Sequence, residues 1–134
     1  MDSEQAKQVL EARLRENSRL LAGELRAGET VLDCGEVNDL RLNTPTDLGA
    51  GEALLFVTNF RLILYRRGQT ESWPYARLQG FWIKRAPRGI PQRGWLRELT
   101  VLPLDHGPQE LVGGRMFLSG VHTLLDQVAK RPRE

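Results

Sequence analysis

The sequence predicts a mainly β fold of the α+β class, with an antiparallel sheet in the middle and one helix at each end. The first observation is the segment GEALLFVTNFRLILYRRG at residues 51–68, where two apolar runs flank Thr58-Asn59. Asn tolerates the positive φ of a tight turn, so this segment predicts a β-hairpin at the centre of the sheet. The second observation is an apolar stripe at helical spacing near the C-terminus, formed by Val121, Leu124, Leu125 and Val128.

Length and composition predict a single globular unit. The chain has 134 residues, of which 40% are hydrophobic and 27% are charged, and these values are ordinary for soluble proteins. Cys34 is the only cysteine, which excludes an intrachain disulfide and favours a reducing compartment. The first residues lack the pattern of a secretory signal, and no apolar run approaches the roughly 20 residues of a membrane span. We therefore expect a soluble, cytoplasmic protein.

Residues from Ser3 to about Ala22 are predicted to form a helix. Ser3 is a suitable N-cap, and Glu4 lies in the first turn, where the helix dipole favours an acidic residue. A weak apolar stripe follows, consisting of Val9, Leu10, Leu14, Leu20 and Leu21. This stripe fits two arrangements. The helix docks on its own domain, or it pairs with a partner helix or with a second copy of the chain.

Between the helices, short apolar segments alternate with segments rich in Gly, Pro, Asn and Asp. The predicted strands are 29–37, 53–57, 60–65, 73–85 as one strand or a pair, 96–104 and 109–112. The predicted turns and loops are 38–50, 58–59, 69–71, 86–94, 105–108 and 113–114. Pro74 confines the start of its strand to an edge or a bend, and Gly80 is a candidate bulge. The final helix is expected at about residues 119–131.

Positive charge is concentrated in the middle of the chain. Residues 61–97 contain nine arginine or lysine residues and a single acidic residue, Glu71. Our candidate anion-binding residues are Arg66, Arg67, Lys84, Arg85, Arg88 and Arg93. Guanidinium groups bind phosphates through two parallel hydrogen bonds, and Ile90 and Trp95 beside them are suited to insertion at a membrane interface. The alternative is that these charges are solvated and only keep the strand ends and the sheet edge soluble.

One stretch of the sequence resembles the signature of GRAM and bacterial pleckstrin-homology (PH)-like domains. The matching residues are Gly51, Thr58-Asn59, Phe60 and Arg61-Leu62-Ile63, with Gly28-Glu29, Trp73-Pro74-Tyr75 and Leu78 around them. The resemblance covers about residues 28–130, and it implies a PH-like split barrel of antiparallel strands capped by the C-terminal helix. It divides the chain into an N-terminal amphipathic helix, 1–27, and a PH-like (GRAM-type) domain, 28–134.

The resemblance implies binding rather than catalysis, without a cofactor. We expect an interaction module that is recruited to an anionic lipid headgroup or to an acidic protein partner, and that is cytoplasmic or peripheral to the membrane. The lipid-reading members place basic residues in the loop joining the first two strands. Here that loop contains Asp39, Asp47 and Glu52 against a lone Arg41, which departs from that pattern. The alternative is a protein-binding or self-associating module that uses a groove between the terminal helix and the sheet.

Other kinds of site find little support in the sequence. Nucleic-acid binding would need exposed aromatic side chains such as Phe81, Trp82 or Trp95, but at least one of the first two is expected in the core, and no RNA-binding signature is present. We expect Cys34 to be a buried small hydrophobe. His106 and His122 lack the spacing of metal ligands. No phosphate-binding loop, nucleophile elbow or carboxylate pair suggests an enzyme.

Two further side-chain roles are predicted. Arg61 is expected to brace the central hairpin through backbone or carboxylate contacts. Trp73, Trp82 and Trp95 are expected in the core or at its hydrogen-bonded rim rather than as ligand platforms.

Overall fold

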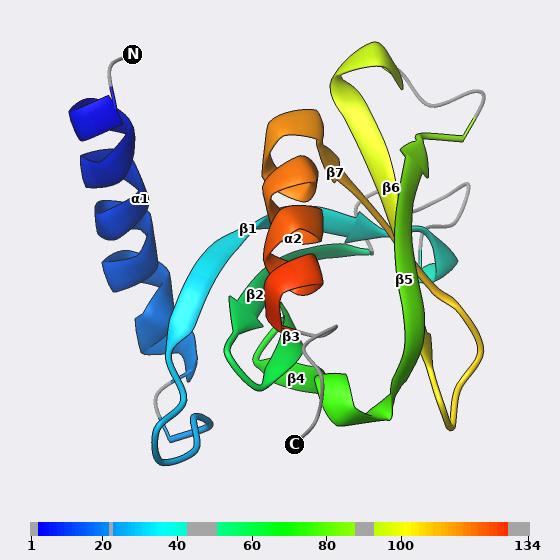
Figure 1. Cartoon of the computed structure of the whole chain (residues 1–134), viewed down its shortest axis with the longest axis horizontal. Coiled ribbons are helices and arrows are strands. Elements are labelled where there is room, and N and C mark those ends of the chain that lie inside the picture. The colour runs from blue at the N-terminus through cyan, green and yellow to red at the C-terminus, as the bar shows by residue number, and fades with distance from the viewer. Residues whose placement is uncertain (1–2, 22, 43–50, 88–92, 129–134) are drawn as a thin grey trace.

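A single curved antiparallel sheet forms the body of the protein (Figure 1). The computed structural model describes residues 3–21, 23–42, 51–87 and 93–128, without the side chains of Arg41 and Arg93. The seven strands are β1 (Val31–Asp39), β2 (Glu52–Thr58), β3 (Arg61–Arg66), β4 (Gln69–Pro74), β5 (Leu78–Arg85), β6 (Leu96–Pro103) and β7 (Gln109–Gly114). Their order in the sheet is β4-β3-β2-β1-β7-β6-β5. The predicted fold class, a split barrel with a helix at each end, is confirmed.

The barrel is split because its two halves meet along a short stretch of β1. This strand pairs with β2 over most of its length but with β7 at only three positions, Val37↔Gly113, Asn38↔Val112 and Asp39↔Leu111. Helix α2 (Arg115–Val128) closes the concave side and contacts β5, β6 and β7. Figure 1 shows it standing in front of the curved sheet. Gly35 lies under this helix, where a Cβ atom would come within 2.8 Å of the Phe117 ring.

Two apolar clusters hold these layers together. The larger lies inside the barrel, where strand residues such as Leu55, Leu62 and Leu99 meet Leu118, Val121 and Leu125 of α2. All six are fully buried, so each contributes on the order of 1.5–3 kcal/mol relative to an exposed side chain. The stripe that predicted this helix is therefore its core-facing side.

The smaller cluster lies on the outer face of the sheet, under the end of the first helix. It consists of Leu21, Cys34, Phe56 and Ile63, with Leu14 packed against it. Helix α1 (Ser3–Ser18) and the 3-10 turn Arg19–Leu21 reach this cluster with their C-terminal part alone. Arg13 pairs there with Asp33, with 2.9 Å between Nη2 and Oδ1. Thus one end of the helix docks on its own domain, as one of the two predicted arrangements requires, while Val9 remains 52% exposed.

The central hairpin is present, but its turn differs from the prediction. Val57 pairs with Leu62, and Asn59 and Phe60 lie between the end of β2 and the start of β3, one residue later than the predicted turn at 58–59. Among the described residues, Arg67 is the only non-glycine with a positive φ, so Asn59 does not adopt the expected left-handed conformation. Instead the Thr58 hydroxyl accepts hydrogen bonds from the amides of Phe60 and Arg61, at 3.1 and 3.0 Å. This side-chain turn replaces the backbone conformation that the prediction assumed.

Three other boundaries also differ from the predictions. The turn expected at residues 69–71 lies at Arg67-Gly68, where both φ angles are positive, 49° and 82°, and residues 69–71 begin β4. Gly113-Gly114, expected as a turn, belong to β7, because the backbone there approaches β1 closely: a Cβ on Gly113 would lie 3.2 Å from the Glu36 carbonyl oxygen. Consequently α2 begins at Arg115, four residues before the predicted start.

Two features marked by Pro and Gly are where the sequence placed them. Pro74 ends the edge strand β4, and the pairing of β5 with β6 shifts register between Leu78 and Gly80. The predicted hairpin between residues 85 and 96 is confirmed by the β5–β6 pairing, although residues 88–92 of its loop lie outside the described part of the chain.

A buried ion pair ties the central hairpin to the segment before β1. Arg61 donates from Nε to Glu29 Oε2 at 3.0 Å and from Nη2 to Glu29 Oε1 at 3.1 Å and the Glu24 carbonyl at 2.7 Å. The Thr58 hydroxyl donates to Glu29 Oε2 at 2.6 Å, and the Tyr75 hydroxyl to the Thr58 carbonyl at 2.6 Å. The predicted bracing role of Arg61 is confirmed.

The charge of Glu29 is stabilised by this network. Burial alone would raise the pKa of its carboxyl, but the hydrogen bonds from Arg61, Thr58 and the Arg26 amide outweigh burial and lower the pKa from 4.5 to about 2. Because the folded-state pKa is lower than the unfolded value, the contribution of Glu29 to stability is present above pH 4.5 and is lost as the pH falls toward 2.

We expect Glu29→Gln to lower the free energy of unfolding at pH 7 by about 3 kcal/mol, because Arg61 is left buried without its partner. The difference from wild type should shrink between pH 4.5 and 2, where Glu29 takes up its proton. Urea unfolding at pH 7 and pH 3 measures both effects. Glu24→Gln is the matched control, since the exposed Glu24 carboxylate has, within the described part of the chain, only a long contact with Thr70. Equal losses of stability from the two variants would contradict the stabilising role that we assign to the Glu29–Arg61 ion pair.

Candidate functional site

Three arginines from different elements meet at one end of the barrel, and we call this region the basic end. Arg85 closes β5 and lies directly opposite Arg97, near the start of β6. Arg115 opens α2 immediately after Gly114, which pairs with Leu96. In Figure 1 the end of β5, the start of β6 and the start of α2 all lie at the top of the molecule. The three side chains and Gly94 line a hollow of about 320 Å³.

The walls of this hollow are partly fixed by contacts of the arginines themselves. The Arg115 guanidinium lies over the ring of Trp95, 5.4 Å from its centroid, at the distance of a cation–π contact. Arg97 donates from Nη1 to the Leu96 carbonyl at 2.8 Å and, more weakly, to the Gly94 carbonyl at 3.4 Å. The contact with Trp95 uses one face of the Arg115 guanidinium, and the carbonyl contacts use only Nη1 of Arg97. Several N–H donors of these two groups therefore remain available to the hollow or to solvent.

The positive charge at the basic end is not neutralised within the described residues. None of their carboxylates forms an ion pair with Arg85, Arg97 or Arg115. Like charges directly opposite each other weaken a strand pair, which applies to Arg85 and Arg97. Arg115 lies in the first turn of α2, which contains no acidic residue and where the helix dipole disfavours a cation. The arrangement therefore costs stability and creates a local positive potential.

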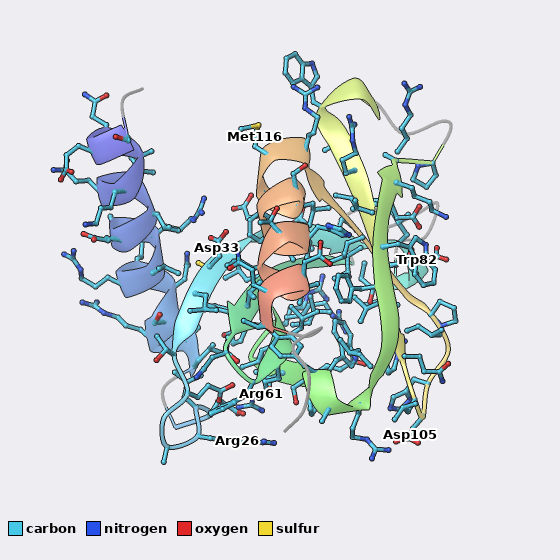
Figure 2. All side chains as sticks on the ribbon, in the orientation of Figure 1. Arg26, Asp33, Arg61, Trp82, Asp105 and Met116 are labelled. Carbon is cyan, nitrogen blue, oxygen red and sulfur yellow. The ribbon has the colours of Figure 1, made fainter. Side chains whose placement is uncertain are left out.

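Two large apolar side chains are exposed beside the arginines. Trp95 is 69% exposed and Met116 is 82% exposed. Figure 2 shows Met116 at the first turn of α2, at the opposite end of the molecule from Arg26, Arg61 and Asp105. The basic end thus combines guanidinium groups with accessible apolar surface. Of the three tryptophans, Trp73 is 2% exposed and belongs to the core as predicted, whereas Trp82 and Trp95 do not.

The structure separates the residues that the sequence grouped as a single patch. Lys84 and Arg85 are neighbours on β5 and point to opposite faces of the sheet. Lys84 Nζ lies 3.6 Å from Oε2 of Glu98, so its charge has a local partner. Arg88 and Ile90 lie outside the described residues, and of Arg93 only the backbone, in the 3-10 turn Arg93–Trp95, is described.

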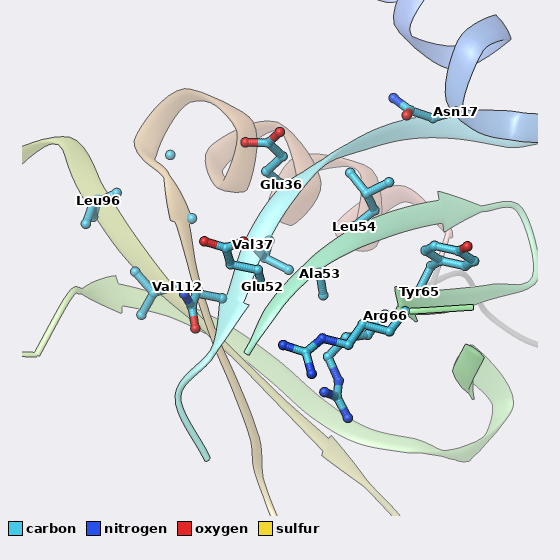
Figure 3. Close-up of a pocket in the computed structure, with 14 residues that line it drawn as sticks. Asn17, Glu36, Val37, Glu52, Ala53, Leu54, Tyr65, Arg66, Leu96 and Val112 are labelled. Carbon is cyan, nitrogen blue, oxygen red and sulfur yellow. The ribbon is translucent and has the colours of Figure 1, made fainter. Parts of the chain in front are cut away.

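Arg66 and Arg67 belong to a different part of the surface. They line a groove of about 670 Å³ on the outer face of the sheet, together with Glu36, Glu52 and Tyr65 (Figure 3). The groove is lined by two carboxylates, Glu36 and Glu52, and by two guanidinium groups, Arg66 and Arg67, so these four charges balance. It does not extend the positive surface of the basic end, so Arg66 and Arg67 stay a prediction of anion binding at a separate part of the surface.

Arg97 and Arg115 are the residues that sequence reasoning missed. A hairpin placed symmetrically about the predicted loop at residues 86–94 would pair Arg85 with Trp95, so the sequence indicated that Arg97 lies near Arg85 but not that the two residues pair. Arg115 carries no such signal, because the sequence predicts a turn at Gly113-Gly114 and a last helix that begins at about residue 119.

A buried carboxyl, that of Glu98, lies on the sheet face opposite the hollow. Burial raises the pKa of Glu98, and a hydrogen bond with the neighbouring Glu110 raises it further, while the nearby Lys84 lowers it. The side chain of Glu98 is 3% exposed and that of Lys84 is 55% exposed. Lys84 therefore lies beside the buried carboxyl of Glu98, and this contact gives it a structural role.

Other chemically active groups are isolated. Cys34 is buried as predicted, and burial raises the pKa of its thiol. Within the described ranges, no three His, Cys, Asp or Glu side chains are grouped so as to hold a metal ion. No described helix has the length and apolar character needed to cross a membrane.

Charge reversal at adjacent positions of β5 should have opposite effects on stability. We expect Arg85→Glu to raise the free energy of unfolding by ~0.2–1 kcal/mol at low salt, because it replaces a like-charge pair with Arg97 by an attractive one. Lys84→Glu should lower it by about 1–2 kcal/mol, because a second carboxylate then faces buried Glu98. Thermal unfolding at low and high salt measures both changes. A loss of stability in Arg85→Glu would contradict our inference that Arg85 and Arg97 repel each other at the basic end.

Comparison with known proteins adds information about the fold. No protein-family model matches the chain, and no curated protein matches it either. Among solved structures, the chain is similar to the C-terminal domain of an unknown protein from Leishmania infantum, with a TM-score of 0.55 and 16% identity. The match covers 84% of this chain and 94% of that chain. At this identity, the likeness shows a shared fold and nothing about binding or activity.

Proposed function

We propose that this protein is a non-enzymatic, PH-like (GRAM-type) binding module that docks on an anionic membrane surface through its basic end. The observation that carries the proposal is the convergence of Arg85, Arg97 and Arg115 from three elements without a neutralising carboxylate among the described residues. The GRAM-like signature and the split barrel closed by α2 support a binding role. The site differs from the loop between the first two strands that lipid-reading relatives use.

The expected affinity is modest. Each basic side chain near an anionic leaflet contributes on the order of 1 kcal/mol, so three contribute about 3 kcal/mol. Trp95 and Met116, both mostly exposed, add apolar contact at the lipid interface, where tryptophan is favoured. Binding of this kind is reversible, and its affinity falls as the ionic strength rises. Because the contacts are few, the loss of any one of them should weaken binding measurably.

The basic end also fixes the orientation of the bound protein. The hairpin end and the start of α2 face the membrane, while the opposite end, where Figure 2 shows Arg26 and Arg61, faces away. Helix α1 then runs beside the barrel with its Val9 surface free. The rigid barrel presents the arginines, and no conformational change is required.

We expect the protein to co-sediment with vesicles containing phosphatidylserine at low salt but not with neutral phosphatidylcholine vesicles. The double variant Arg85→Glu/Arg115→Glu should lose this binding by about tenfold or more, because it reverses two charges at the contact surface. The matched control is Arg26→Glu/Arg67→Glu, which makes the same change in net charge away from the basic end.

Equal loss from both pairs would show that total charge, rather than the basic end, determines binding. Failure of the wild-type protein to bind acidic vesicles at any salt concentration would overturn the membrane proposal.

A second candidate function, a protein-binding or self-associating module, is favoured by the half-docked first helix. Val9 is 52% and Leu20 40% exposed, and the α1 helix has no fully buried residue. The neighbouring groove of about 670 Å³ includes Asn17 near the end of the helix. An apolar helix surface of this kind is suited to packing against a second helix.

If the module self-associates through α1, its molar mass in light scattering after gel filtration should correspond to a dimer and should fall with dilution. Val9→Asp should then give a monomer, because a carboxylate would be buried in the contact. Glu4→Asp, on the same helix, is a control that keeps the charge. A monomer in the wild-type protein at all concentrations would exclude this arrangement.

A further inference from the structure

We infer that the hollow at the basic end is a discrete site for one phosphate-type dianion, a phosphomonoester in chemical terms. The inference rests on the proposed function and makes it more specific. A diffuse positive surface attracts any anionic lipid, whereas this hollow would select a terminal phosphoryl group over a phosphodiester or a carboxylate. The source of the phosphoryl group is either a lipid headgroup or a free metabolite.

The hollow has the size of a small ligand site. Its volume of about 320 Å³ lies at the lower end of the range for ligand pockets, roughly 300–1,000 Å³. It is lined by three arginines and a glycine, and Gly94 has no side chain to occupy the space. The lining therefore offers charge and hydrogen-bond donors around a volume suited to a compact group.

The donor chemistry fits a phosphoryl group in particular. Each guanidinium presents a planar set of N–H donors that matches two oxygens of a phosphate, so it binds with two parallel hydrogen bonds. Arg97 is held in place by its bonds to the Leu96 and Gly94 carbonyls, and Arg115 by stacking on Trp95. Because these side chains are partly fixed already, binding an anion costs less side-chain entropy.

The backbone supports the same ligand. The hollow lies where α2 begins, and the first amides of a helix, with its dipole, favour an anion. The first turn of α2 contains Arg115 in place of an acidic side chain, so no carboxylate of the helix competes for that position. A dianion between Arg85, Arg97 and Arg115 would offset their mutual repulsion and connect the β5–β6 hairpin to α2.

The first measurement uses soluble glycerol 3-phosphate as the probe, with the full chain labelled with nitrogen-15. We expect saturable binding with one site, a higher thermal midpoint and a shift of the Trp95 indole N–H signal, while the signals of Trp73 and Trp82 stay in place. Glycerophosphocholine, a phosphodiester, should not reproduce these effects. Shifts of all three indoles, or none, would overturn the discrete site.

The second measurement separates the site from diffuse charge. Arg97→Lys/Arg115→Lys keeps both charges but removes the planar forks, so it should weaken glycerol 3-phosphate binding by about tenfold or more. The same variant should still bind phosphatidylserine vesicles nearly as well as wild type. Arg26→Lys/Arg67→Lys is the matched control and should change neither. Equal binding of the probe to the site variant and to wild type would overturn the inference.

The vesicle arms distinguish the two sources of the phosphoryl group. Vesicles with phosphatidic acid, a phosphomonoester lipid, are compared with phosphatidylserine vesicles of equal surface potential. Preference for phosphatidic acid that disappears in Arg97→Lys/Arg115→Lys supports a lipid ligand. Binding of glycerol 3-phosphate without vesicle binding supports a soluble ligand and removes the membrane proposal. Binding of both vesicles equally, without binding of the soluble probe, removes the discrete site and leaves the membrane proposal standing.

Discussion

The pairing of β7 with both β1 and β6 is the constraint on which the rest of the structure depends. Among the residues that the structure describes, it is the only junction between the two halves of the sheet, and it includes three residue pairs on the β1 side. Gly113 permits it, because any side chain there would press on the β1 backbone. The same strand then delivers α2 to the concave face and Arg115 to the neighbourhood of Arg97. Closure of the barrel and assembly of the basic end therefore have one cause.

The arginines of this protein fall into two electrostatic classes. Arg61 is buried, and its charge is matched by Glu29 and by the Glu24 carbonyl, so it stabilises the hairpin. Arg85, Arg97 and Arg115 repel one another at an accessible surface, and Arg115 also opposes the helix dipole. Stability does not explain the second class. An unfavourable charge cluster beside exposed Trp95 and Met116 is what a surface that meets an anion requires.

The fold was largely predictable, because its signals are local. Thr58, Asn59 and Arg61 lie within one turn, so the hairpin and its brace could be inferred from a short segment, as could α2 from its stripe. The site was less predictable, because it depends on contacts between distant segments. Arg85 meets Arg97 through the register of a hairpin with a long loop, and Arg115 depends on β7 continuing through two glycines. Glycine weakens the interior of a strand or marks the close approach of another backbone, and only the structure shows that Gly113 approaches β1 in this way.

The sheet is open, so β4 and β5 are its edge strands, and each has a neighbouring strand on one side only. Pro74 removes an amide from the first, while the second has an irregular stretch between Leu78 and Gly80 and ends in Lys84 and Arg85. Proline, local distortion and lysine are the features by which natural proteins prevent strand-to-strand polymerisation. These features disfavour the pairing of β4 or β5 with a strand of a second molecule, and Arg85, at the end of one of these two strands, also belongs to the basic end.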